Sequence, residues 1–159
     1  MTSKLAQEFL EEHRHLTRGL YQIREALEGG DLEAASDQAE QLDRLVGAHM
    51  EFEEQVFYPE LVDRLGGTFV SRLYEEHEEG QTAVKTLLTD PTVALDPTAK
   101  KQLLGQVQTA LDHAISCGTL LSHIGDLDPV DEERVMQRWQ EIHRRSPRWT
   151  ELPARSEDA

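Results

Sequence analysis

A histidine and a glutamate stand four residues apart near the middle of the chain, in the stretch HMEFEEQVFYPEL that begins at His49. On a helix of 3.6 residues per turn, His49 and Glu53 lie one above the other on the same face. Four apolar residues are expected on that face too: Leu42, Leu45, Val46 and Val56. Both polar groups should therefore point into the core, where unpaired burial costs free energy. A metal ion removes that cost by binding the imidazole nitrogen and the carboxylate oxygen, and a His–Glu hydrogen bond inside a helix bundle is the alternative.

Three further histidines occur in segments with helical periodicity. His13 and His77 each lie within an apolar stripe, and His113 lies at the edge of one. A lone histidine on an apolar face is an ordinary core residue, but one inward histidine on each of four helices, together with Glu53, favours a metal site. We expect the remaining histidines to lie at the surface: His15, His123 and His143.

The stretch HAISCGTLLSHIG, which begins at His113, resembles the stretch that begins at His49. Each has a histidine first and an apolar pair seven and eight residues later. This degenerate internal repeat places Cys117 at the position of Glu53, and it therefore predicts that residue 117 faces the same site.

Long amphipathic helices must position these side chains, because the chain is rich in good helix formers and Gly or Pro interrupts it at few places. Short turns between them predict an all-α fold, an up-down-up-down antiparallel four-helix bundle with a short fifth C-terminal helix. Counting along the first two helices places His13 and His49 at heights that differ by roughly 3 Å. The expected bundle domain covers residues 1–145, and residues 146–159 are expected to form a flexible tail. The predicted helices run from a cap at Thr2 or Ser3 to about Glu28, from Asp31 to about Arg64 with a bend or end at Pro59, from a cap at Thr68 to about Leu88, from Asp96 to about Ile124, and from Pro129 to about Arg145.

Composition limits the classes of function. A chain of 159 residues with 38% hydrophobic residues fits one domain. The net charge of −15 argues against nucleic acid or an anionic membrane surface as partner. A single cysteine excludes an intramolecular disulfide and suits a reducing compartment. The N-terminal residues contain no apolar signal-peptide core, no run is long enough to span a membrane, and we expect a cytoplasmic location. No phosphate-binding loop, dinucleotide fingerprint or nucleophile elbow is present.

Over roughly residues 5–124, the chain resembles the hemerythrin-like HHE cation-binding domain family. The most specific match is the signature H-x-x-x-E-E followed by an aromatic residue and proline, formed by His49, Glu53, Glu54, Phe57, Tyr58 and Pro59. The motif E-H-x-x-L at Glu12, His13 and Leu16 and the pair Glu76-His77 support it. The resemblance implies a non-heme iron pair inside a four-helix bundle, with Glu53 as the bridge. The implied metal ligands are His13, His49, Glu53, His77 and His113.

The fourth helix departs from the family pattern, which usually places a carboxylate four or five residues after the histidine. Here those positions hold Cys117 and Gly118. Three outcomes remain open: an iron pair held by one carboxylate and solvent bridges, a single ion, or a site that has lost its metal. Cys117 is either a thiolate ligand or a small buried residue that fills space. Tyr58 and Tyr74 are either hydrogen-bond donors beside the ligands or ordinary packing residues.

The leading hypothesis is a non-heme iron protein that binds, senses or reacts with a small ligand such as dioxygen, peroxide or nitric oxide. The alternative is a helical interaction module whose degenerate metal site now serves as a polar core. Neither a catalytic residue nor catalytic turnover is predicted from the sequence.

Overall fold

The computed structural model describes residues 3–120, 122–123 and 127–153, and within these ranges every regular element is a helix. This confirms the predicted all-α bundle with a further C-terminal helix. The elements are α1 Lys4–Glu28, α2 Leu32–Phe52, η1 Glu53–Phe57, α3 Tyr58–Leu65, α4 Gly67–Thr89, η2 Pro91–Leu95, α5 Pro97–Cys117, η3 Gly118–Leu120, α7 Pro129–Arg145 and η4 Trp149–Glu151.

Side-chain caps set most of the helix starts. The side chains of Ser3, Asp31 and Asp96 each accept a hydrogen bond from the backbone N–H three residues later, as the sequence predicts. Thr68 does not cap its helix, because α4 already begins at Gly67. Gly66, which precedes α4, has φ 88°, a conformation that favours glycine.

The second predicted helix is continuous but irregular. Regular α2 ends at Phe52, and Glu53–Phe57 form a π-helical turn in which the Tyr58 backbone N–H donates to the Glu53 carbonyl. Pro59 explains the disturbance, since its ring clashes with the carbonyl four residues earlier and it has no N–H to donate. The break therefore begins at Glu53, six residues before the proline itself. Such turns are rare and occur frequently at functional sites.

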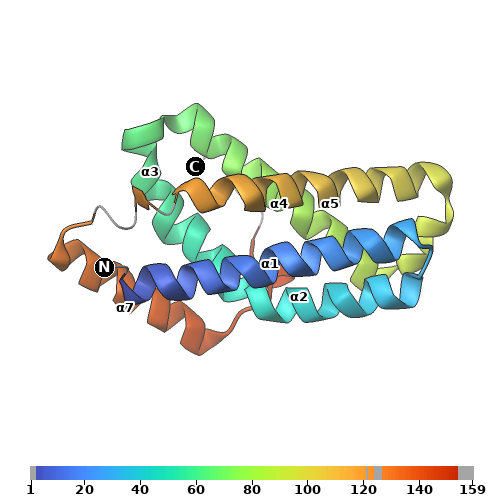
Figure 1. Ribbon diagram of the computed structural model, residues 1–159, viewed down its shortest axis with the longest axis horizontal. Coiled ribbons are helices and arrows are strands. Elements are labelled where there is room, and N and C mark those ends of the chain that lie inside the picture. Colours follow the sequence, from blue (N-terminus) through green and yellow to red (C-terminus); the bar gives the residue numbers. More distant parts are fainter. Residues whose placement is uncertain (1–2, 121, 124–126, 154–159) are drawn as a thin grey trace.

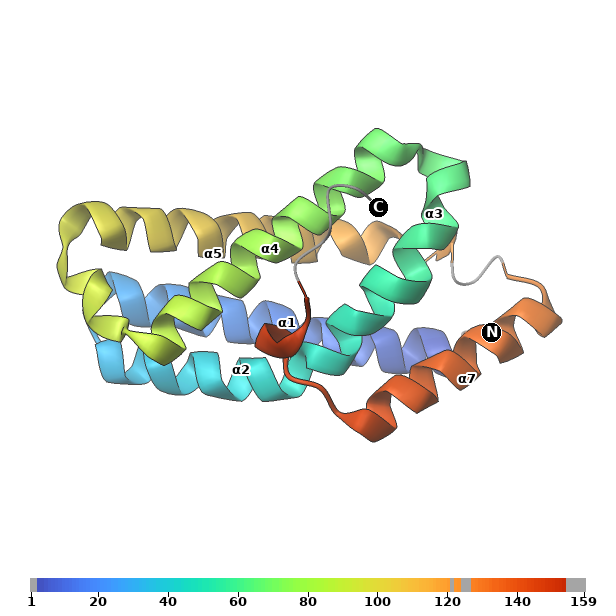
Figure 2. The same ribbon diagram turned by 180° about the vertical axis from the view of Figure 1, so that it is seen from behind.

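The four long helices pack side by side in the two views of Figures 1 and 2, and successive long helices run in opposite directions. α1 packs against α2 and α5, and α4 packs against the same two helices. α7 lies across the end of the bundle that contains the N-terminus and contacts α2. None of the helices in the described ranges combines the length and apolar character of a membrane span.

The fourth bundle helix differs slightly from its expected course. Regular α5 ends at Cys117 and continues as the 3₁₀ turn Gly118–Leu120. The predicted end at Ile124 lies outside the described residues.

Residues 146–153 do not behave as the loosely held tail that the sequence suggests. The indole of Trp149 is buried in the bundle core, and an added Cβ at Gly80 would lie 2.7 Å from it. The Gln81 amide donates to the carbonyls of Trp149 and Leu152, and the Thr150 backbone N–H donates to Asp43 at 2.8 Å. A single buried tryptophan with satisfied backbone groups thus anchors this segment. Residues 154–159 lie outside the described residues, and the division of the chain at residue 145 stays a prediction.

Candidate metal centre

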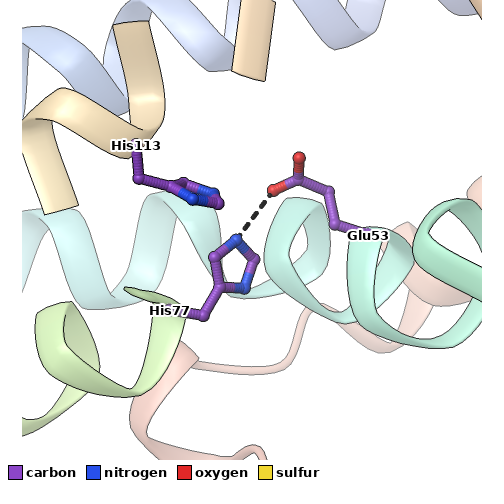
Figure 3. Close-up of side chains that lie close together, drawn as sticks. All are labelled: Glu53, His77 and His113. Atoms are coloured by element: carbon purple, nitrogen blue, oxygen red, sulfur yellow. Dashed lines mark ion pairs between the residues drawn. The ribbon is translucent and has the colours of Figure 1, made fainter. Parts of the chain in front are cut away.

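Three predicted site residues converge between the helices. Glu53 begins the π-helical turn, His77 comes from the middle of α4, and His113 comes from the last turns of α5 (Figure 3). One possible ligand atom from each lies within 4.8 Å of the others. The Glu53 Oε1 atom lies 3.2 Å from Nε2 of His77. All three side chains are buried, so they face one another and not water.

His49 and His13 extend this cluster toward α1. Nε2 of His49 lies 3.5 Å from Oε1 of Glu53, one turn along the same chain segment. The centroids of the His13 and His49 imidazole rings are 5.9 Å apart. Both side chains are buried, and Nε2 of each has no hydrogen-bond partner in the part of the chain that the structure describes. The structure therefore brings His49 close to Glu53 and leaves His13 beside it, with a free nitrogen.

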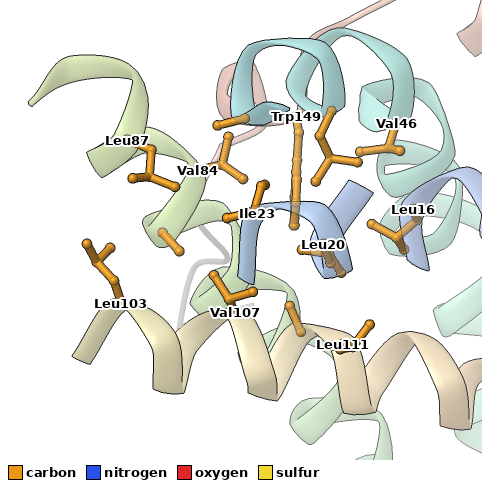
Figure 4. Packing of buried hydrophobic residues seen from close by; sticks show 14 of the residues in the cluster. Leu16, Leu20, Ile23, Val46, Val84, Leu87, Leu103, Val107, Leu111 and Trp149 are labelled. Carbon is orange, nitrogen blue, oxygen red and sulfur yellow. The ribbon is translucent and has the colours of Figure 1, made fainter. Parts of the chain in front are cut away.

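These five side chains form a polar layer between two hydrophobic clusters. One cluster, part of which is drawn in Figure 4, contains Leu16, Val46, Val84 and Leu111. The other contains Phe9, Phe52, Leu73 and Cys117. On α1, α4 and α5 the ligand candidate lies between a residue of one cluster and a residue of the other. The sequence places Leu45 on this inward face too, but its side chain is 53% exposed, and that prediction is wrong.

Tyr58 and Cys117 also face the polar layer. The Tyr58 hydroxyl lies 2.8 Å from Nε2 of His77 and 3.0 Å from Nε2 of His113. The Cys117 thiol donates to Oε2 of Glu53 at 3.1 Å. Tyr58 is thus more than a packing residue, and Cys117 is directed at the site as the internal repeat predicts. The signal for Tyr58 was its place in the family signature, five residues after Glu53.

The charges of this cluster are strongly coupled. Burial would raise the pKa of Glu53, but His49, His77 and His113 hold it well below its usual range. Burial would lower the pKa of His77, but its contacts with Glu53 and Glu54 raise it to about 9. Burial lowers the pKa of His13 to about 4. Without metal, the layer therefore holds a Glu53 carboxylate paired with a His77 imidazolium.

Three further carboxylates lie behind the histidines, on the Nδ1 side of each ring. Oε1 of Glu12 lies 3.2 Å from Nδ1 of His49. Glu54 lies 3.4 Å from Nδ1 of His77, and Glu76 lies 3.9 Å from Nδ1 of His113. Each glutamate is the sequence neighbour of a candidate ligand on one helix and faces the histidine of the next. Carboxylates in this position orient metal-binding imidazoles and increase their basicity.

The three histidines expected at the surface do not share one environment. His15 and His123 lie outside the polar layer and are partly exposed. His143 is partly buried, and its Nε2 lies 2.7 Å from Oε2 of Glu12. His143 thus differs from the other two by its contact with Glu12, which the sequence did not predict. Helical periodicity alone did not reveal this contact, because Glu12 and His143 are 131 residues apart.

The donor set fits a metal cation. Imidazole nitrogens and a carboxylate oxygen suit iron, zinc and related transition metals. Within the described ranges, Nε2 of His13 and Nε2 of His49 are buried without a hydrogen-bond partner, and such groups are costly unless something binds them. With carboxylates on the Nδ1 side, the Nε2 atoms of His49, His77 and His113 are directed at the interior. A cation in the polar layer would satisfy all of these groups at once.

Comparison with protein-family models gives a match that covers most of the chain. The model of the hemerythrin HHE cation-binding domain matches residues 4–117, which includes every predicted ligand. Searches of curated proteins and of solved structures found no match. The matched segment ends at Cys117, so α7 and the segment that carries Trp149 lie beyond it. The chain belongs to the hemerythrin HHE cation-binding domain family.

Proposed function

We propose that this domain binds non-heme iron, as one ion or a pair, in the polar layer. The proposed ligands are His13, His49, Glu53, His77 and His113. The observation that carries the proposal is the pair of buried Nε2 atoms on His13 and His49 that have no hydrogen-bond partner among the described residues, beside the buried Glu53 carboxylate.

Iron in this layer would supply a Lewis-acidic, redox-active centre for a small ligand such as dioxygen, peroxide or nitric oxide, which the protein would bind, sense or react with. The protein's own groups define the conditions there. Glu53 provides negative charge, and the His77 imidazolium must release its proton before Nε2 can act as a ligand. The Tyr58 hydroxyl and the Cys117 thiol are the donors that face the same space. The hydrophobic clusters on both sides exclude water.

We also propose that the protein is cytoplasmic and does not bind nucleic acid, and two features of its composition support this. A single buried cysteine is compatible with the reducing cytoplasm. A net charge of −15 disfavours nucleic acid as a partner.

The test is iron per chain after aerobic purification, compared between wild type and four variants, of which His13→Ala is one. His49→Ala and Glu53→Ala should each lose most of the iron, because each removes a buried donor. His15→Ala is the matched control, since His15 lies on α1 only two residues from His13 but outside the layer. It should retain the metal. Equal loss from His15→Ala and His13→Ala would overturn the ligand assignment.

Thermal melting distinguishes this proposal from the alternative of a degenerate site. Iron that binds only the folded state stabilises it, by about 2.7 kcal/mol at a free concentration 100 times Kd. Removal of the metal should therefore lower the melting temperature. If wild type holds no iron and added iron leaves its melting temperature unchanged, the polar layer serves as a core element of an interaction module.

A further inference from the structure

Glu12 is held more firmly than the other two carboxylates that face an imidazole. Among the described residues, Glu12 is the one of the three that hydrogen-bonds to its imidazole, with Oε1 3.2 Å from Nδ1 of His49, whereas Nδ1 of His77 and Nδ1 of His113 have no hydrogen-bond partner. Its other oxygen, Oε2, lies 2.7 Å from Nε2 of His143 on α7. No contact of this kind from α7 is found for Glu54 or Glu76 among the described residues.

The orientation of His143 is fixed on its other side as well. Its Nδ1–H donates to the Trp139 carbonyl at 2.7 Å, one turn earlier on the same helix. Nε2 is therefore directed at Glu12. Burial would lower the pKa of His143, but the hydrogen bond and the charge of Glu12 raise it above its ordinary value. A charged imidazolium that donates to a carboxylate is among the stronger hydrogen bonds in proteins.

The Glu12 carboxylate in turn determines the tautomer of His49. An ionised carboxylate only accepts hydrogen bonds, so the Nδ1 of His49 must carry the proton. The Nε2 lone pair is then left toward Glu53, where a metal ligand is needed. The Phe9 ring packs 4.5 Å from the His49 ring and restricts its rotation.

We propose that His143 positions Glu12 so that Glu12 orients His49 as a nitrogen ligand, which makes α7 a functional part of the metal centre. The tautomer of His49 can be tested without metal, whereas the affinity argument rests on the proposed iron site. α7 lies beyond the segment that the family model matches. Of the three residues His143, Glu12 and His49, only His143 therefore comes from outside the matched segment. In the terms of this proposal, Glu12 and His143 are positioning residues.

The tautomer can be read directly in the metal-free protein from the ¹⁵N shifts of the His49 ring. In the neutral form of the His49 ring, wild type should show Nδ1 protonated and Nε2 unprotonated. His143→Leu keeps the side-chain volume but removes the donor, so Glu12 is released toward solvent and the Nε2–H tautomer should appear. His143→Gln places an amide N–H near the position of Nε2 and should restore the wild-type pattern. An identical tautomer in all three proteins would overturn the proposal.

Iron affinity provides the second measurement. Loss of a carboxylate that orients a ligand lowers metal affinity by about 10–100-fold, so we expect at least a tenfold loss in His143→Leu and recovery in His143→Gln. Arg145→Leu is the matched control, since Arg145 also joins α7 to α2, through Glu51, without touching Glu12. It should keep the wild-type affinity. An equal loss in Arg145→Leu would show that docking of α7 matters and that the hydrogen bonds of His143 do not. If wild type binds no iron, the proposed function fails, and the ¹⁵N measurement still decides whether His143 positions His49.

Discussion

Glu53 is the residue on which the candidate centre converges. Its two oxygens contact His49, His77 and Cys117, which come from three different helical segments. The π-helical turn that begins at Glu53 allows Tyr58 to face the same interior, five residues later. On a regular α-helix, a residue five positions away is rotated by about 140° from the first. The wider turn thus brings the Glu53 carboxylate and the Tyr58 hydroxyl into one site.

Replacing Cys117 by glutamate should strengthen or complete a two-iron centre. Sγ of Cys117 lies 3.1 Å from Glu53 Oε2, so a carboxylate at residue 117 would face Glu53 from the opposite wall. A bridging carboxylate neutralises metal charge and can contact two ions, whereas each imidazole donates one lone pair to one ion. Without metal, two buried carboxylates side by side should destabilise the apoprotein. Iron per chain and apoprotein melting, measured for both proteins, provide the test.

Cys117→Ala is the control for that variant, because it removes the thiol and adds no carboxylate. It should hold as much iron as wild type if the thiol only donates to Glu53. Unchanged iron stoichiometry and affinity in Cys117→Glu, with an undisturbed apoprotein, would contradict the predicted role of residue 117.

At the residue level, the positions directed into the core were predictable and their partners were not. The placement of His13, His49, His77 and His113 in the core follows from apolar periodicity, and their burial confirms it. The contact between Glu12 and His143 depends on which helices become neighbours, and sequence spacing does not contain that information. Leu45 shows the opposite error, since it satisfies the periodicity yet lies at the surface.

At the level of elements, most helix starts could be predicted from the local sequence. Ser3, Asp31 and Asp96 cap as expected because an N-cap needs only a short polar side chain at the right residue. The π-helical turn was not predictable in detail, since Pro59 indicates a disturbance but not its form. The docking of η4 was missed because a short segment with prolines has no periodicity to interpret.

Trp149→Ala should strongly destabilise the protein. The indole is 1% exposed and packs in the same cluster as Leu20, Ile23 and Val107, and its loss leaves a cavity. Truncations of this kind cost about 3–5 kcal/mol. Urea unfolding measures the change in the free energy of unfolding. Leu95→Ala is the control, since Leu95 is 71% exposed and should change stability by no more than about 0.5 kcal/mol. A cost below about 1 kcal/mol for Trp149→Ala would mean that residues 146–153 are not docked in solution.

At the scale of the whole molecule, the metal-free bundle should be most stable near pH 6.5. Burial lowers the pKa of His13 to about 4. Between pH 6.5 and 4 the unfolded chain therefore binds a proton that the folded protein does not, and stability decreases as the pH decreases. Burial would lower the pKa of His77, but Glu53 and Glu54 raise it to about 9. Between pH 6.5 and 9 the folded protein keeps that proton while the unfolded chain loses it, and stability falls as pH rises.

Each group contributes a slope of at most about 1.4 kcal/mol per pH unit. Urea unfolding of the apoprotein between pH 4.5 and 9 measures both sides of the maximum. His77→Gln should flatten the alkaline side, whereas His15→Gln should leave the profile unchanged. A stability that rises steadily from pH 6.5 to 9 would contradict the assignment of charge in the polar layer.

The polar layer divides the interior into two hydrophobic halves, and the proposed ligands come from α1, α2, α4 and α5 together with the π-helical turn. An ion held there would cross-link segments as far apart in sequence as residues 13 and 113. Because His49 and Glu53 are at most 1% exposed, a chelator cannot reach the ion while the bundle is closed. The lifetime of a bound ion would then be determined by how often the helices separate. Release of metal and opening of the fold would be the same kinetic event.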